Sequence, residues 1–137
     1  MTLDYDLIAL VTPLPDYRLC WMLNRLLDVD FLRVDDIEVN FPRRKQIGFF
    51  PRFRYYRPVE RQLYHLVVNK GRHFNLLPEH GKVDYILMIR GFEESDSRTE
   101  LVLQLRNIRQ VQAVFALEPD DLKSKSNLIF DDDADLE

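Results

Sequence analysis

The chain has 137 residues, of which 46% are hydrophobic and 12% aromatic, and its net charge is −4. This length and composition indicate one folded domain with a sizeable core and exclude an intrinsically disordered chain. The apolar runs are too short to cross a bilayer, and the start, MTLDYDLIALV, lacks the basic region of a signal peptide, so we expect a cytoplasmic protein. The single cysteine, Cys20, excludes an internal disulfide and a cysteine-based zinc site.

Charge is distributed unevenly along the chain. Residues 41–61, FPRRKQIGFFPRFRYYRPVER, hold seven cations against one acid, Glu60. This stretch therefore carries +6, and the other 116 residues carry −10. Five of the acids fall in residues 131–137, DDDADLE, which we expect to form a disordered acidic tail. A basic, aromatic centre beside an acidic end is the strongest functional signal in the sequence.

The first half of the chain predicts a strand, a helix and two further strands. Residues 3–11 form an apolar run that ends at a Pro-rich turn, and Asp16 is then placed to cap a helix that continues to about Asp28. Strands are predicted over residues 31–39 and 46–56. The helix carries a wide apolar arc, made of Tyr17, Leu19, Cys20, Trp21, Met22, Leu23, Leu26 and Leu27.

The second half predicts three strands and a second helix. Residues 61–69 and 83–90 are apolar on both faces, which is typical of central strands. A capping box at residues 97–100, SRTE, opens a helix over residues 98–108. Residues 111–119 predict the closing strand.

This order of elements predicts a single α+β domain over residues 1–130. We expect an approximately six-stranded, largely antiparallel sheet with both helices packed on one face. The spacing over residues 83–117 is also that of a ferredoxin-like βαβ half. The order of the strands stays open, as does whether residues 120–130 pack on the domain or trail from it.

Alternation within residues 46–56 assigns side chains to two faces of a strand. Ile47, Phe49, Phe53 and Tyr55 would share the core side, whereas Phe50 and Tyr56 would lie beside the arginines on the exposed side. Pro51 cannot donate a ladder hydrogen bond, so it indicates either an edge strand or a bulge.

The basic stretch is the candidate binding surface. Arginines contact phosphates, and exposed rings stack on unpaired bases, so we expect an anionic partner, either RNA or an acidic protein. The candidate partner-binding residues are Arg43, Arg44, Lys45, Arg52, Arg54, Arg57, Arg61, Phe50 and Tyr56. The alternative is an edge strand that its charges keep soluble. The acidic tail could compete with the partner by folding over this surface.

Glu79 and Asp84 could act as an acid and a base, or bind a metal with His65, His73 and His80. Their spacing matches no ligand or catalytic pattern, so we expect no catalytic residue, metal or cofactor. Asp84 is more simply explained as the start of a strand, where it accepts hydrogen bonds from loop amides or pairs with Arg90.

Residues 77–85, LPEHGKVDY, resemble the motif Ile-Pro-Glu-x-x-x-Val-Asp-Tyr, for which an uncharacterised Bacteroidetes family, the IPExxxVDY family, is named. The matching residues are Pro78, Glu79, Val83, Asp84 and Tyr85, and Leu77 replaces the isoleucine. The resemblance implies an intracellular bacterial protein but no activity, cofactor or ligand. We interpret the motif residues as structural.

These signals favour a non-enzymatic binding or adaptor module that uses the basic, aromatic strand. One alternative is a small-ligand sensor, which only the ferredoxin-like character of residues 83–117 suggests. The other is a purely structural or scaffold role.

Overall fold

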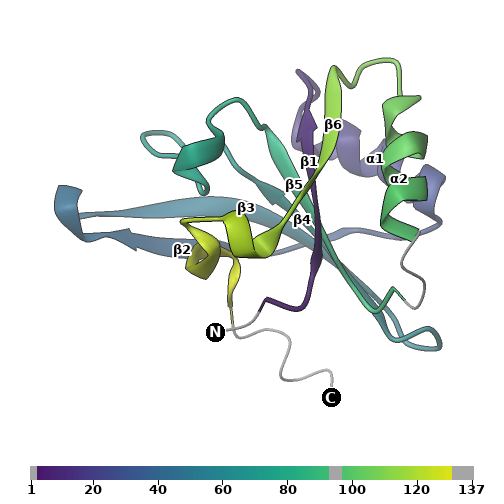
Figure 1. Ribbon diagram of the computed structural model, residues 1–137, viewed down its shortest axis with the longest axis horizontal. Helices are drawn as coiled ribbons and strands as arrows, with labels where there is room; N and C mark the ends of the chain where they lie inside the picture. The colour runs from purple at the N-terminus through teal and green to yellow at the C-terminus, as the bar shows by residue number, and fades with distance from the viewer. Residues whose placement is uncertain (1–2, 93–96, 131–137) are drawn as a thin grey trace.

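A computed structural model describes residues 3–92 and 97–130 and shows the expected α+β domain (Figure 1). Its elements are β1 (Asp6–Val11), α1 (Asp16–Leu27), β2 (Leu32–Phe41), β3 (Gln46–Arg57), β4 (Gln62–Val68), β5 (Tyr85–Arg90), α2 (Ser97–Arg106) and β6 (Ala113–Leu117). The acidic tail predicted for residues 131–137 lies outside the described residues. In the part of the chain that is described, no helix is long and apolar enough to cross a membrane.

The six strands form one sheet in the order β2-β3-β4-β5-β1-β6, and every neighbouring pair is antiparallel. Strand β1 therefore lies between β5 and β6, which run parallel to each other and are connected through α2. This is a split βαβ unit, so the arrangement expected from residues 83–117 is present. Strands β2 and β6 form the two edges of the sheet.

Both faces of the sheet are covered, but by different kinds of structure. On one face, α1 and α2 contribute to a single core with strand residues such as Ile8, Leu66 and Leu87. The helix residues buried there are Leu19, Cys20, Leu23, Leu101, Val102 and Leu105. The prediction that both helices pack on one face is therefore confirmed.

The second face is covered by two segments without α-helix. Leu76 and Leu77 come from the loop between β4 and β5, and Leu122 and Leu128 come from the chain after β6. Residues 120–130 therefore pack on the domain rather than trailing from it. This covering layer decides which side chains of β3 reach solvent.

The position of Pro51 bears on both predicted explanations, an edge strand and a bulge. Strand β3 pairs with β2 on one side, but β4 pairs only with Arg52–Arg57, so Pro51 lies just outside the part of β3 that is paired on both sides. Its pairing with β2 shifts beside the proline, because Arg52 pairs with Val34 and Phe50 with Ile37. Asp35 and Asp36 of β2 thus lie opposite the single residue Pro51, which has no N–H to donate, so the predicted bulge is present.

Candidate functional site

The seven cations of residues 41–61 do not form one surface. Arg43, Arg44 and Lys45 are exposed at the tip of the β2–β3 hairpin. Arg61 is also exposed but follows the opposite end of β3, which is 12 residues long. A strand rises about 3.4 Å per residue, so roughly 40 Å of strand separates Arg61 from the tip. The exposed contiguous cations are therefore Arg43, Arg44 and Lys45, and the other four do not extend this patch.

Arg52 and Phe50 are buried, contrary to their expected exposure. Their exposed fractions are 3% and 1%. The Arg52 Nε donates to the carbonyl of Asp35 at 3.2 Å, and its guanidinium lies 4.7 Å from the centre of the Phe130 ring. The alternation correctly placed Phe50 and Arg52 on the same face of β3. That face is the one that the C-terminal segment covers, which periodicity cannot reveal.

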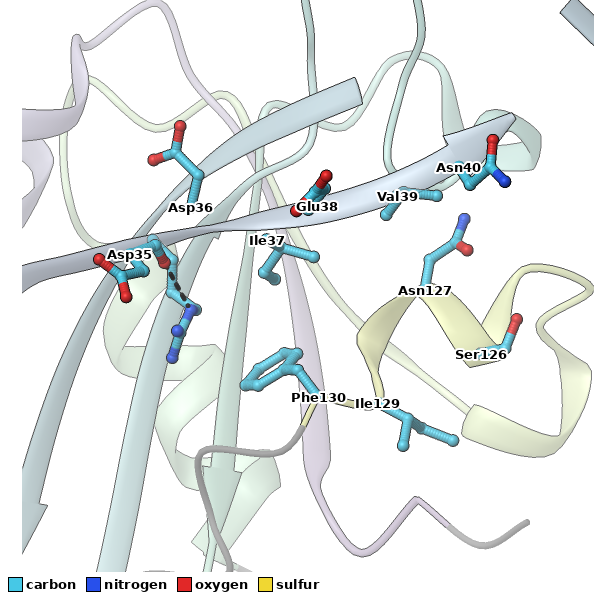
Figure 2. Close-up of a pocket in the computed structure, with 11 residues that line it drawn as sticks. Asp35, Asp36, Ile37, Glu38, Val39, Asn40, Ser126, Asn127, Ile129 and Phe130 are labelled. Carbon is cyan, nitrogen blue, oxygen red and sulfur yellow. Dashed lines mark hydrogen bonds between the residues drawn. The ribbon is translucent and has the colours of Figure 1, made fainter. Parts of the chain in front are cut away.

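A groove of about 430 Å³ lies where the C-terminal segment meets β2 (Figure 2). In Figure 2, Ile37 points toward Phe130, whereas Asp36 and Glu38 point away from the C-terminal segment. Asp36 is paired with Arg33 at 2.6 Å. Arg52 also lines this groove, so it forms part of a largely covered junction and not of an open basic face.

Arg57 is committed to a structural contact. Its Nη2 donates to the carbonyls of Leu27 and Asp28 at 2.9 and 2.8 Å. These carbonyls lie at the C-terminal end of α1, where the helix leaves acceptors unsatisfied and a positive charge is favourable. Arg57 thus fastens α1 to the sheet. Arg54 and Tyr56, from the same face of β3 as Arg52, are half-buried.

The hairpin tip itself is tightly built. A 3-10 turn, Pro42–Arg44, is closed by Lys45, which has φ 53° and donates its N–H to the Pro42 carbonyl at 3.2 Å. Beyond the turn, Ile47 and Phe49 are 52% and 58% exposed. The tip therefore holds cations and apolar side chains in the same short stretch of backbone.

A second segment, residues 70–75, packs against this tip. Its Phe74 stacks on Phe41 with ring centres 4.5 Å apart, and Arg44 lies 5.2 Å above the Phe74 ring. The turn requires Gly71, because a Cβ there would lie 2.4 Å from the Phe74 carbonyl and 2.8 Å from the Phe50 ring. This close approach places Arg72 and His73, both exposed, next to the hairpin.

We call the combined region the tip surface. It consists of Arg43, Arg44, Lys45, Ile47 and Phe49 from the hairpin and Arg72, His73 and Phe74 from the loop. A hollow of about 340 Å³ separates the two segments. Residues 39–50 and 70–75 contain no acid, so the side chains that these segments contribute are neutral or basic. Sequence reasoning missed Arg72 and His73, because they lie outside the basic stretch and reach it only through the fold.

The IPExxxVDY-like residues make structural contacts on both faces of the sheet, because Val83 is in the core of the second face and Tyr85 in the core beneath the helices. The Asp84 carboxylate accepts the Thr12 N–H at 2.9 Å and lies 3.1 Å from the Lys70 ammonium. Its side chain is 23% exposed. The predicted use of a loop amide is therefore confirmed, but the cation beside it is Lys70 and not Arg90. Arg90 instead lies over the Tyr5 ring.

The other motif residues have equally definite structural contacts. Pro78 opens a 3-10 turn, and Val83 is buried in the core of the second face. The Tyr85 hydroxyl donates to the Leu14 carbonyl at 2.6 Å. Glu79 accepts hydrogen bonds from the N–H and the hydroxyl of Ser124. Burial alone would raise the pKa of Glu79, but these hydrogen bonds bring it below its usual value.

Asn69 organises the same loop and was missed by the sequence analysis. It is fully buried, and its amide donates to the carbonyls of His80 and Val83 while accepting the Leu77 N–H. A single asparagine at the end of a strand gives no signal of this role. The loop that holds Glu79 and Asp84 is therefore fixed by structural contacts at several points.

The residues considered for catalysis are not brought together. Among residues 3–92 and 97–130, no three His, Cys, Asp or Glu side chains are grouped so that they could hold a metal ion. His65 is buried in β4, His73 lies at the tip surface, and His80 ends the 3-10 turn. Burial, together with the nearby Asp16 charge, raises the pKa of the Cys20 thiol to about 12. The thiol is therefore protonated at neutral pH.

No protein-family model matches this chain, and no curated protein does.

Proposed function

We propose that this protein is a non-enzymatic binding or adaptor module that contacts an anionic partner, either RNA or an acidic protein, through the tip surface. We further propose that it acts in the cytoplasm and belongs to the IPExxxVDY family. The family proposal depends on the match at residues 77–85, and the intracellular location is what that resemblance implies.

One observation carries the binding proposal: two segments separated in the sequence combine four exposed cations with accessible rings and no acid. The cations are Arg43, Arg44, Lys45 and Arg72. Phosphate and carboxylate groups pair with such cations, and unpaired bases or apolar side chains can pack on Phe49 and Phe74. The hairpin also projects away from both helices, which leaves a partner room to approach (Figure 1).

The test is a salt-dependent binding measurement on the full chain. The probes are a 20-nucleotide oligouridylate, a 20-base-pair RNA duplex and polyglutamate as a carboxylate polymer. If three or four phosphates of the single strand are neutralised, the association constant should fall roughly 20- to 50-fold between 50 and 200 mM salt. Binding of polyglutamate without RNA would select an acidic protein as the partner.

A charge-matched pair of variants localises the contact. Replacing Arg43, Arg44 and Lys45 by Gln should abolish most of the salt-sensitive binding and leave the melting temperature nearly unchanged, because exposed cations add little to stability. The control replaces three exposed cations elsewhere, Arg18, Lys82 and Lys123, by Gln. Equal weakening by both variants would reduce the effect to net charge. Absence of salt-sensitive binding to all three probes would refute the proposal.

A further inference from the structure

Helix α1 carries more apolar surface than the core uses. The core takes Leu19, Cys20 and Leu23, whereas Tyr17, Trp21 and Leu26 are 69%, 58% and 40% exposed. The apolar arc predicted for this helix is therefore wider than its buried stripe. An exposed tryptophan is notable, because Trp is depleted from ordinary surfaces and enriched where proteins bind one another.

Trp21 and Leu26, but not Tyr17, line a shallow and widely open hollow. The hollow measures about 500 Å³, and its apolar lining comes from Trp21, Met22 and Leu26 of α1 and from Ile108 of the turn after α2. Backbone hydrogen bonds fix that turn, because Ile108 donates to Leu105 at 3.1 Å and accepts from Val111 at 3.0 Å. These hydrogen bonds therefore fix the wall of the hollow that Ile108 forms. We call this region the α1 hollow.

The charged residues that line the α1 hollow are all positive. They are Arg25 and Arg109, and the remaining polar lining residue is Gln110. The Arg25 guanidinium lies 4.8 Å from the centre of the Trp21 ring, where it can still present N–H donors to a partner. A ligand that fills this hollow thus meets an apolar floor and two guanidinium groups.

We propose that the α1 hollow docks an acidic amphipathic helix of a partner protein. Apolar side chains on one face of that helix would pack on Trp21 and Leu26, and its carboxylates would pair with Arg25 and Arg109. Arginine binds carboxylates through two parallel hydrogen bonds, which fixes the orientation as well as adding affinity. Helix-in-groove recognition places apolar anchors three and four residues apart in this way. The proposal is independent of the tip surface, which lies at the opposite end of the molecule (Figure 1).

Trp21 is the only tryptophan in the chain, so its fluorescence reports on the hollow directly. The probe is a 14-residue helical peptide with Leu at positions i, i+3, i+4 and i+7 and Glu on the remaining positions of the polar face. Binding should shift the Trp21 emission to the blue in a saturable and salt-sensitive manner. The same peptide with every Glu replaced by Gln should bind more weakly, and with Lys it should not bind.

Variants of the full chain then test the two parts of the proposal. Arg25→Gln with Arg109→Gln should weaken binding of the acidic peptide roughly five- to tenfold, as expected for two ion pairs at an interface rim. Leu26→Ser should weaken it in the presence of both arginines. The charge-matched control, Arg43→Gln with Arg44→Gln, should retain wild-type affinity, with melting temperatures confirming that each variant is folded.

Four outcomes would overturn the proposal. Equal binding of the acidic and lysine peptides would show that charge does not select the occupant, and a lack of binding by all peptides would show that the hollow is not a peptide site. A blue shift that follows protein concentration, with a dimer in sedimentation, would assign the hollow to a second copy. A blue shift with phosphatidylglycerol-containing vesicles but not with peptides would assign it to a membrane surface.

Discussion

The two halves of the β2–β3 hairpin both contain arginines and phenylalanines, but these residues differ in their exposure. In the outer half, Arg43 and Arg44 are exposed beside Phe49, which is 58% exposed. In the inner half, Arg52 and Phe50 are 3% and 1% exposed. Phe49 and Phe50 are adjacent, so their side chains lie on opposite faces of β3, and the face that carries Phe50 and Arg52 is the covered one. In this stretch, the residue type alone therefore does not reveal whether an arginine or a phenylalanine is exposed.

The difference arises from segments that are distant in the sequence. The C-terminal segment brings Phe130 over Arg52, and the end of α1 brings two carbonyls to Arg57. At the tip, the short loop that holds Phe74 packs on Phe41 and leaves Arg43 and Lys45 exposed. A basic, aromatic segment can thus contain some residues that stabilise the fold and others that are exposed and available for binding. Paired substitutions, one of each kind, test this division.

The largest contrast is expected between Phe50→Ala and Phe49→Ala. Removal of the buried Phe50 ring leaves a cavity in the second-face core and should lower the free energy of unfolding by about 3–5 kcal/mol. Phe49→Ala should change it by no more than about 0.5 kcal/mol, because the side chain is largely exposed. Chemical denaturation of both variants measures the difference. Similar losses would show that the tip surface is a packed extension of the core.

The next contrast concerns pH and two histidines, the buried His65 of β4 and the exposed His73 of the tip surface. Burial, together with Arg52, Arg54 and Arg90, lowers the pKa of His65 to about 3. An unfolded histidine titrates near pH 6.5, so between these values the unfolded chain binds a proton that the folded chain does not. Stability is therefore fully present above about pH 6.5 and falls by about 1.4 kcal/mol per unit as the pH drops through this window.

His65→Gln should remove this loss of stability at low pH. The loss of unfolding free energy between pH 7 and pH 5 should be about 2 kcal/mol smaller in the variant than in the wild type. His73→Gln is the matched control, because His73 is exposed at the tip surface, and it should follow the wild-type curve. Urea denaturation at each pH gives the comparison. An unchanged curve for His65→Gln would mean that this imidazole is accessible to protons in the folded state.

Most of the fold could be predicted because it depends on local patterns. The apolar run at residues 83–90 gave a central strand, and the helix predicted over residues 98–108 is present as α2, Ser97–Arg106. Pro51 alone indicated an edge position or a bulge, since a missing N–H has a direct consequence for a ladder, and the structure shows the bulge. Strand order was not available from these patterns, because the loop lengths allow β1 to pair with several partners.

The candidate site was less predictable, because it depends on coverage and long-range contacts. Alternation correctly separated the two faces of β3 but gave no information on which face a later segment would cover. Asp84 was correctly assigned to an amide, yet its cation, Lys70, comes from a loop whose path the sequence does not specify. Arg72 joins the tip surface for the same reason. The excess apolar arc of α1 was visible, but only the structure shows that Trp21 is outside the core.

The smallest contrast compares Arg57, the last residue of β3, with Arg44, in the turn that precedes β3. Arg57→Gln loses two hydrogen bonds to the end of α1, so it should lower the free energy of unfolding by about 1 kcal/mol and speed hydrogen exchange in the last turn of that helix. Arg44→Gln should leave both quantities unchanged, since this side chain is exposed and only lies over the Phe74 ring. The same two variants should reverse their order in the binding assay, where Arg44→Gln weakens the oligouridylate complex and Arg57→Gln does not. Equal effects of the two substitutions in either assay would show that the arginines of this hairpin are not divided between folding and binding.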